Sequence, residues 1–191
     1  MAYPELQPSL ALDILPTHNL CTLALADISF YPPSYVAGTP SYQIYPPNFP
    51  SVVVTFTQSS SNIYNSNNLN LTCTDDNNLI TPLPDGIWRV VQTINPPLNF
   101  TNDKSFLRVE NLKHQLGLAF LKTDMINCKA GIESEDMKYL MQIWSYIQGA
   151  IAASNQCNMV LAMQLYNMAS RTLKNYMKEN WKSITTRTSW Y

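Results

Sequence analysis

The placement of proline constrains this chain more than any other feature. All thirteen prolines lie between Pro4 and Pro97, and no proline occurs from Leu98 to Tyr191. Proline fixes φ and removes a backbone donor, so it is found in turns, loops and strand edges and is excluded from helix interiors. The pattern predicts an α+β chain of two modules, a β module over residues 1–97 and a helical module over residues 98–191.

Runs typical of β-strands fill the first module. Residues 20–29 alternate, with Leu23 and Leu25 on one face and smaller side chains on the other, as expected for a half-buried strand. Further strand-like runs occur at 41–45, 51–57, 69–74 and 87–94. Short strands without a helical pattern between them favour an antiparallel β-sandwich over a parallel βαβ sheet.

The second module shows the 3.6-residue period of amphipathic helices. A first helix is predicted from about Asp103 to Lys129, ended by Gly131. Ser134 is placed to cap a second helix, and Ser154-Asn155 marks the break before a third. These elements predict a three-helix bundle followed by a flexible C-terminal tail.

Charge is sparse and unevenly distributed. Charged residues make up 13% of the chain, against about 25% in typical soluble domains. Residues 1–104 carry a net charge of −5 and residues 105–191 a net charge of +4. A surface with few charges and two halves of opposite sign favours lasting contacts with protein neighbours.

No motif in the chain indicates catalysis or metal binding. His18 and Cys21 form a single His-x-x-Cys pair, and His114 lies far away in the sequence. Residues 75–78 are rich in oxygen ligands but lack the ligand spacing of a calcium loop, which favours a solvated turn. The chain also lacks a nucleophile elbow, a phosphate-binding loop and a zinc-protease motif. We therefore expect no enzymatic activity, no cofactor and no metal, and the isolated cysteines are predicted to be free thiols.

The sequence also predicts a chain without a membrane span. Its richest apolar stretch, residues 139–153, is interrupted by Gln142, Ser145 and Gln148, whereas about 20 apolar residues are needed to cross a bilayer. The first fifteen residues lack a basic residue before their apolar ones, so no secretory signal is expected.

A basic stripe is the sharpest charge feature. Its members follow one another at helical spacing: Arg171, Lys174, Lys178 and Lys182. Three interpretations stay open: a solvated face near a helix C-terminus, a docking face for an acidic protein, and a contact with DNA. Trp190 and Tyr191 end the chain, either as a frayed end or as aromatic anchors for a partner.

Five segments together resemble structural proteins of tailed bacteriophages of the crAss-like group. They are DILPTHNLCTLALADISFYP (13–32), YPPNFPSVVVTFT (45–57), LPDGIWRVVQTINP (83–96), NDKSFLRVENL (102–112) and IQGAIAASNQCNMVLAMQLYNMASRTL (147–173). The resemblance implies a β-sandwich followed by a helical domain, and a place in the neck and tail region near the portal. It brings no catalytic residues.

The resemblance implies a subunit of a homo-oligomeric ring in the head-to-tail connector, roughly twelve-fold. Its partners would be the portal and other neck or tail proteins, with DNA as a passing contact and no membrane. Its location would be the virion, assembled in the host bacterial cytoplasm. The alternative is a non-enzymatic adaptor, with a ligand-binding β-sandwich and a tetratricopeptide-like helical pair that binds a peptide.

Overall fold

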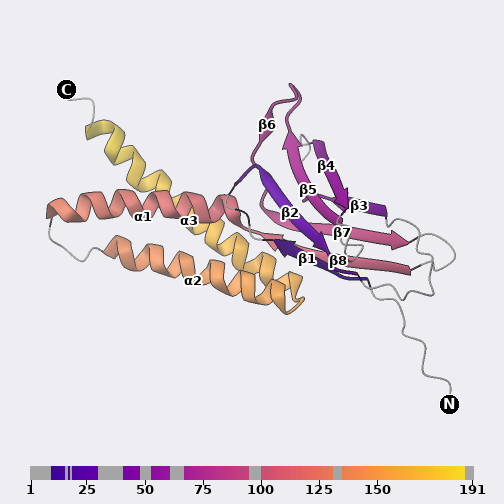
Figure 1. Ribbon diagram of the computed structural model, residues 1–191. Helices are drawn as coiled ribbons and strands as arrows, with labels where there is room; N and C mark the ends of the chain where they lie inside the picture. Colours follow the sequence, from indigo (N-terminus) through magenta and orange to yellow (C-terminus); the bar gives the residue numbers. More distant parts are fainter. Residues whose placement is uncertain are drawn as a thin grey trace, which may run out of the picture. The chain divides into compact units, whose positions relative to one another are not determined.

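The computed structural model describes residues 10–15, 17, 19–29, 41–47, 53–60, 67–94, 100–130 and 135–187 (Figure 1). Within these residues the chain is α+β, with two sheets and three helices. It divides into two compact units. The first comprises Met1–Pro84 and Trp88–Ser105, and the second comprises Asp85–Ile87 and Phe106–Tyr191. Asp85–Ile87 thus belong to the second unit although they precede Pro97, and the domain boundary at Pro97 stays a prediction.

The larger sheet has five described strands. β1 (Leu12–Leu15), β2 (Thr22–Asp27), β5 (Asn67–Thr74) and β4 (Val53–Ser60) lie in the order β1-β2-β5-β4, and the short β6 (Ile80–Thr81) pairs with β5. All these pairings are antiparallel.

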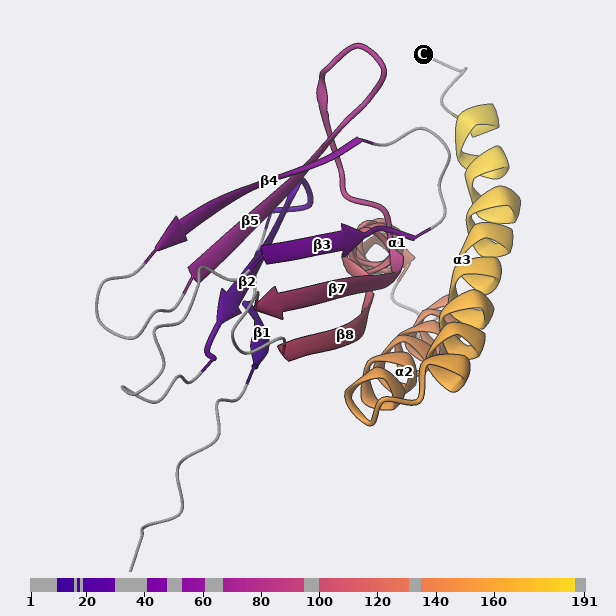
Figure 2. The same ribbon diagram turned by 90° about the vertical axis from the view of Figure 1, so that its right-hand side faces the viewer.

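The smaller sheet has the order β3-β7-β8, as Figure 2 shows. Its strands are β3 (Ser41–Tyr45), β7 (Gly86–Ile94) and β8 (Phe100–Arg108), and β3 pairs antiparallel with β7. The five predicted runs are therefore confirmed as β2, β3, β4, β5 and β7. β1, β6 and β8 complete the sheets, and the sequence had not marked them clearly.

Alternation along the strands places the apolar side chains inside. In β2, Leu23 and Leu25 are buried as predicted, and β5 buries Leu69 and Leu71 opposite them. The same rule also buries a charge, because the next inward position after Leu25 is Asp27, which has no exposed surface.

A buried polar network binds Asp27 to both sheets. Its carboxylate accepts hydrogen bonds from the Tyr42 hydroxyl of β3, from Nε2 of Gln92 in β7 at 2.7 Å and from the backbone N–H of Ser29 at 2.9 Å. Gln92 Nε2 also donates to Ser29 Oγ at 2.8 Å. A buried carboxylate is tolerated when donors surround it, so the network fixes β2, β3 and β7 against one another.

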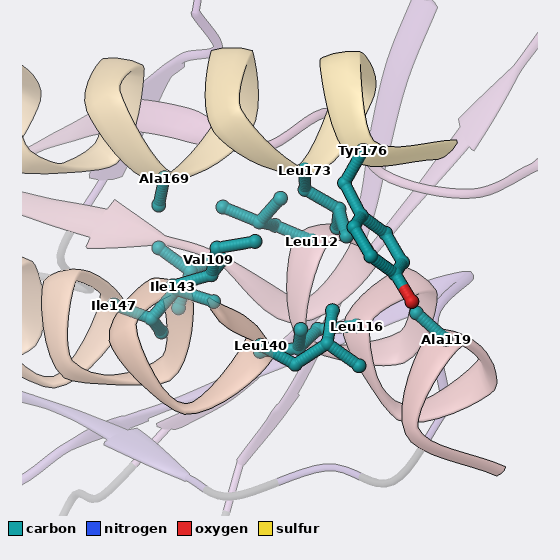
Figure 3. Packing of buried hydrophobic residues seen from close by; sticks show 10 residues of the cluster. All are labelled: Val109, Leu112, Leu116, Ala119, Leu140, Ile143, Ile147, Ala169, Leu173 and Tyr176. Atoms are coloured by element: carbon teal, nitrogen blue, oxygen red, sulfur yellow. The ribbon is translucent and has the colours of Figure 1, made fainter. Parts of the chain in front are cut away.

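The second unit contains the three helices α1 (Glu110–Ala130), α2 (Glu135–Asn155) and α3 (Met159–Arg187). Figure 3 shows side chains from all three meeting in one apolar cluster. The cluster consists of Val109, Leu112, Leu116, Ala119, Leu140, Ile143, Ile147, Ala169, Leu173 and Tyr176. The C-terminal helical segment predicted from the sequence is therefore present.

The predicted start of the first helix at Asp103 is wrong. Residues 100–108 form β8, and the helix begins at Glu110. Asp103 is exposed and accepts a bidentate hydrogen bond from Arg89 on β7. The apolar residues Phe106 and Val109 suggested a helical period, although both are buried at the strand's end and just beyond it. Gly131 and Ser134, predicted to end α1 and cap α2, lie outside the described residues.

Candidate interaction surface

The outward face of α3 carries most of the predicted basic stripe. Arg171, Lys174 and Lys178 are exposed, and within the described part of the chain none of the three has a hydrogen bond or ion pair. Lys182 lies in α3, but its side chain is outside the described set, as are Trp190 and Tyr191 entirely. The structure therefore brings together three of the six predicted residues.

The opposite face of α3 holds the stripe in position. Ala162, Ala169, Leu173 and Tyr176 are buried, and Asn158 caps the helix by accepting a hydrogen bond from the Leu161 N–H at 3.2 Å. The Tyr176 hydroxyl meets Thr123 Oγ1 of α1 at 3.1 Å, and its ring lies 5.8 Å from that of Tyr139 of α2. Packing on one side thus fixes which side chains face outward.

The outward face continues as an apolar patch toward the start of α3. Val160 is 71% exposed, Met168 is 46% exposed and Leu161 is 41% exposed. At 3.6 residues per turn, these side chains and the three cations fall within one arc of about 140°. The apolar part of this face was not predicted, because an apolar residue in a helix is ordinarily assigned to the core. The signal in the sequence is that the helix has more apolar residues than one buried stripe can hold.

A second exposed feature lies in the first unit, at the turn from β5 to β6. Oδ1 of Asp75 accepts hydrogen bonds from the N–H groups of Asn77 at 2.9 Å and Leu79 at 3.0 Å, and Asn78 takes a left-handed φ of 60°. Asp76 is exposed, and Leu79 and Ile80 are 64% and 66% exposed. The turn therefore presents carboxylates beside two large apolar side chains on a hydrogen-bonded backbone.

Asp85 is a buried acid of the second unit. Its carboxylate accepts hydrogen bonds from Arg108 at 2.9 Å and from the N–H groups of Asn111 at 3.1 Å and Leu112 at 2.8 Å. Burial raises the pKa of Asp85, while the two backbone donors and Arg108 oppose the rise. The two N–H donors belong to the first turn of α1 and Arg108 is the last residue of β8, so the group is a helix cap with a buried counter-ion.

Tyr166 of α3 also has a shifted pKa. Burial raises the pKa of its hydroxyl to about 12, and the Asp85 carboxylate adds to the rise. A phenol with a higher pKa is a weaker acid, so Tyr166 stays neutral at physiological pH.

The residues considered for metal binding are not gathered by the structure. In the described ranges there is no group of three or more His, Cys, Asp or Glu side chains able to hold a metal ion. His114 is exposed on α1, and Cys21, Cys73 and Cys157 are free thiols. His18 and the Cys128 side chain lie outside the described set.

Comparison with known proteins adds no relative. Neither protein-family models nor curated proteins nor solved structures gave a significant match to this chain. Across the described residues, no helix combines the length and apolar character that crossing a membrane requires.

Proposed function

We propose that this chain is a virion structural protein that acts by self-assembly and docking. It is a subunit of a ring in the head-to-tail connector of a tailed bacteriophage, next to the portal and other neck proteins. It has no catalytic role. The exposed face of α3, with three unpaired cations among its described side chains beside exposed apolar ones, is the observation that carries the proposal.

This face supports docking more than solvation. A solvated face needs no large apolar side chains, yet Val160, Leu161 and Met168 are exposed there. Apolar groups ringed by polar ones are typical of protein contact sites. The opposite net charges of residues 1–104 and 105–191 favour a head-to-tail arrangement of copies, and heterologous contacts of that kind close into rings when the rotation per subunit permits.

The proposal includes a finer architecture for each unit. The two sheets form a β-sandwich, supported by the hydrogen bonds from Tyr42 and Gln92 of one sheet to Asp27 of the other. The three helices form a closed bundle, supported by their common apolar cluster. In this cluster, α1 covers the apolar faces of α2 and α3. A single tetratricopeptide-like pair has no third helix of its own and would need another partner to cover its apolar face.

The oligomeric state of the purified protein tests the proposal. Mass photometry and negative-stain electron microscopy are expected to reveal rings of one defined size, alone or on addition of the portal protein. Replacing Lys174, Lys178 and Lys182 with Glu is expected to abolish these rings while circular dichroism stays unchanged. The matched control, Lys122→Glu with Lys138→Glu, reverses exposed lysines on α1 and α2 and is expected to assemble normally.

Two results would contradict the proposal. A chain that stays monomeric with and without the portal and binds a defined peptide would be the adaptor. Binding to DNA that weakens steeply with salt, without ring formation, would assign the stripe to nucleic acid.

A further inference from the structure

We propose that the β5–β6 turn of one copy docks on the outward face of α3 in the next copy. The turn surface is Asp75, Asp76, Leu79 and Ile80, and the α3 surface is Val160, Leu161, Met168, Arg171, Lys174 and Lys178. This inference rests on the proposed self-assembly and names the two surfaces that meet.

The turn surface has the properties of a preformed knob. Its backbone is closed by the hydrogen bonds from the Asp75 N–H to the Leu79 carbonyl and from the Asn78 N–H to the Asp75 carbonyl, each 3.0 Å long. Leu79 and Ile80 are about two-thirds exposed at 64% and 66%. Because the loop is already ordered by its own bonds, docking it costs less conformational entropy than docking a flexible loop.

The α3 surface matches the knob in chemistry. Apolar side chains occupy its first part and cations the second, just as the turn offers apolar side chains beside carboxylates. The face from Val160 to Lys178 extends about 27 Å at 1.5 Å per residue. A compact turn of six residues is shorter than this, so it would engage the junction of the two parts, where Met168 lies next to Arg171 and Lys174.

Charge complementarity selects a second copy as the occupant. The described turn is acidic, the described α3 face is basic, and the two belong to halves of the chain with net charges of −5 and +4. Neither surface is self-complementary, because carboxylates would face carboxylates or cations would face cations. The contact is therefore heterologous and leaves one free turn and one free face on every open chain of subunits.

A contact of this size is weak as an isolated pair. Standard stable interfaces use about 20–30 residues a side, and this one uses fewer. We expect closure of the ring to supply the remaining stability, since each subunit then makes two contacts. Association should also weaken as salt screens the charges.

The test uses two full-length variants. The turn variant carries Asp76→Lys, Leu79→Ser and Ile80→Ser, and it keeps Asp75, whose carboxylate holds the turn. The face variant carries Arg171→Glu, Lys174→Glu and Lys178→Glu. For each variant alone, the protein concentration needed for half-assembly is expected to rise at least about ten-fold. The circular dichroism spectrum is expected to stay unchanged. An equimolar mixture has one intact turn and one intact face, so sedimentation at high protein concentration, where a single weak contact is populated, is expected to detect heterodimers and nothing larger.

The outcomes separate this inference from the proposed function. If the wild-type chain forms rings and both variants do so equally well, the turn-to-α3 contact is wrong and self-assembly stands. If the mixture rebuilds full rings, the two surfaces do not meet each other. A wild-type chain that stays monomeric at millimolar concentration and does not bind the portal protein would overturn both proposals.

Discussion

Asp85 is the residue on which the start of the helical unit depends. The position before α1 is Val109, which has no side-chain acceptor, so the N–H groups of Asn111 and Leu112 are satisfied by a carboxylate 26 and 27 residues earlier in the chain. The same carboxylate pairs with Arg108, whose side chain is 3% exposed. One acid therefore serves as helix cap and counter-ion together.

Replacing Asp85 with Ala removes the cap and the counter-ion at once. We expect the free energy of unfolding of the helical unit to fall by about 3–5 kcal/mol, the usual result of breaking a buried ion pair. Urea denaturation followed by circular dichroism at the helix band measures it. Asp103→Ala, which breaks the exposed pair with Arg89, is the control and should change stability little; equal losses in the two variants would contradict the assignment.

Tyr166 gives a prediction about alkaline pH. A pKa raised from 10.0 to about 12 means that the fold favours the neutral hydroxyl. Its stabilising contribution is therefore complete below pH 10 and is lost as pH rises through about 12. Between pH 10 and about 12, the free energy of unfolding should fall less steeply for Tyr166→Phe than for the wild type. Urea denaturation at several pH values measures both curves. Parallel curves for the two proteins would contradict a buried Tyr166 hydroxyl.

At the scale of elements, the sequence predicted most strands and all three helices. Apolar and polar residues alternate in β2 and β5, and apolar residues recur at helical spacing in α2 and α3. These elements were predictable because each pattern lies within one short stretch of sequence. β8 was missed because residues 103–109, of which 103–108 lie in β8, fit both the strand period and the helix period, and only pairing with β7 decides between them. The buried Asp27 network and the Asp85 cap join residues far apart in sequence, so no local pattern contains them.

The two helical glycines give a matched prediction. A Cβ at Gly117 of α1 would meet nothing within 4 Å, whereas one at Gly149 of α2 would lie 3.1 Å from Cδ1 of Leu165. Gly117→Ala should therefore raise the free energy of unfolding by about 0.5–1 kcal/mol through helix propensity. Gly149→Ala should gain less, because Leu165 must shift; thermal denaturation of both variants measures the difference. A larger gain at Gly149 would contradict the close approach of α2 and α3.

At the scale of the whole molecule, the candidate surfaces were only partly predictable. The basic stripe follows from helical spacing alone, but the exposure of Val160, Leu161 and Met168 depends on which face of α3 the other helices cover. Residues 75–78 were predicted as a solvated turn, but the exposure of Leu79 and Ile80, on which the proposed assembly contact rests, depends on the fold.

Assembly should respond to salt if the surfaces meet as proposed. Raising the ionic strength from 0.05 to about 0.5 M shortens the range of charge interactions to a few ångströms, so the concentration needed for half-assembly should rise. Sedimentation of the wild type and the face variant across this range measures the effect. The face variant should respond less, and an equal response in both would show that other charges govern assembly.

The division of the chain into two units has a consequence for recombination between related genes. Asp85–Ile87 belong to the second unit, although Pro84 before them and Trp88 after them belong to the first. A single crossover between two related genes, placed between Ile87 and Arg108, would combine Asp85 of one parent with Arg108 and α1 of the other. The offspring would keep the ion pair only if the first parent carried Asp85 and the second carried Arg108, so we expect these two positions to vary together and recombination between them to be rare.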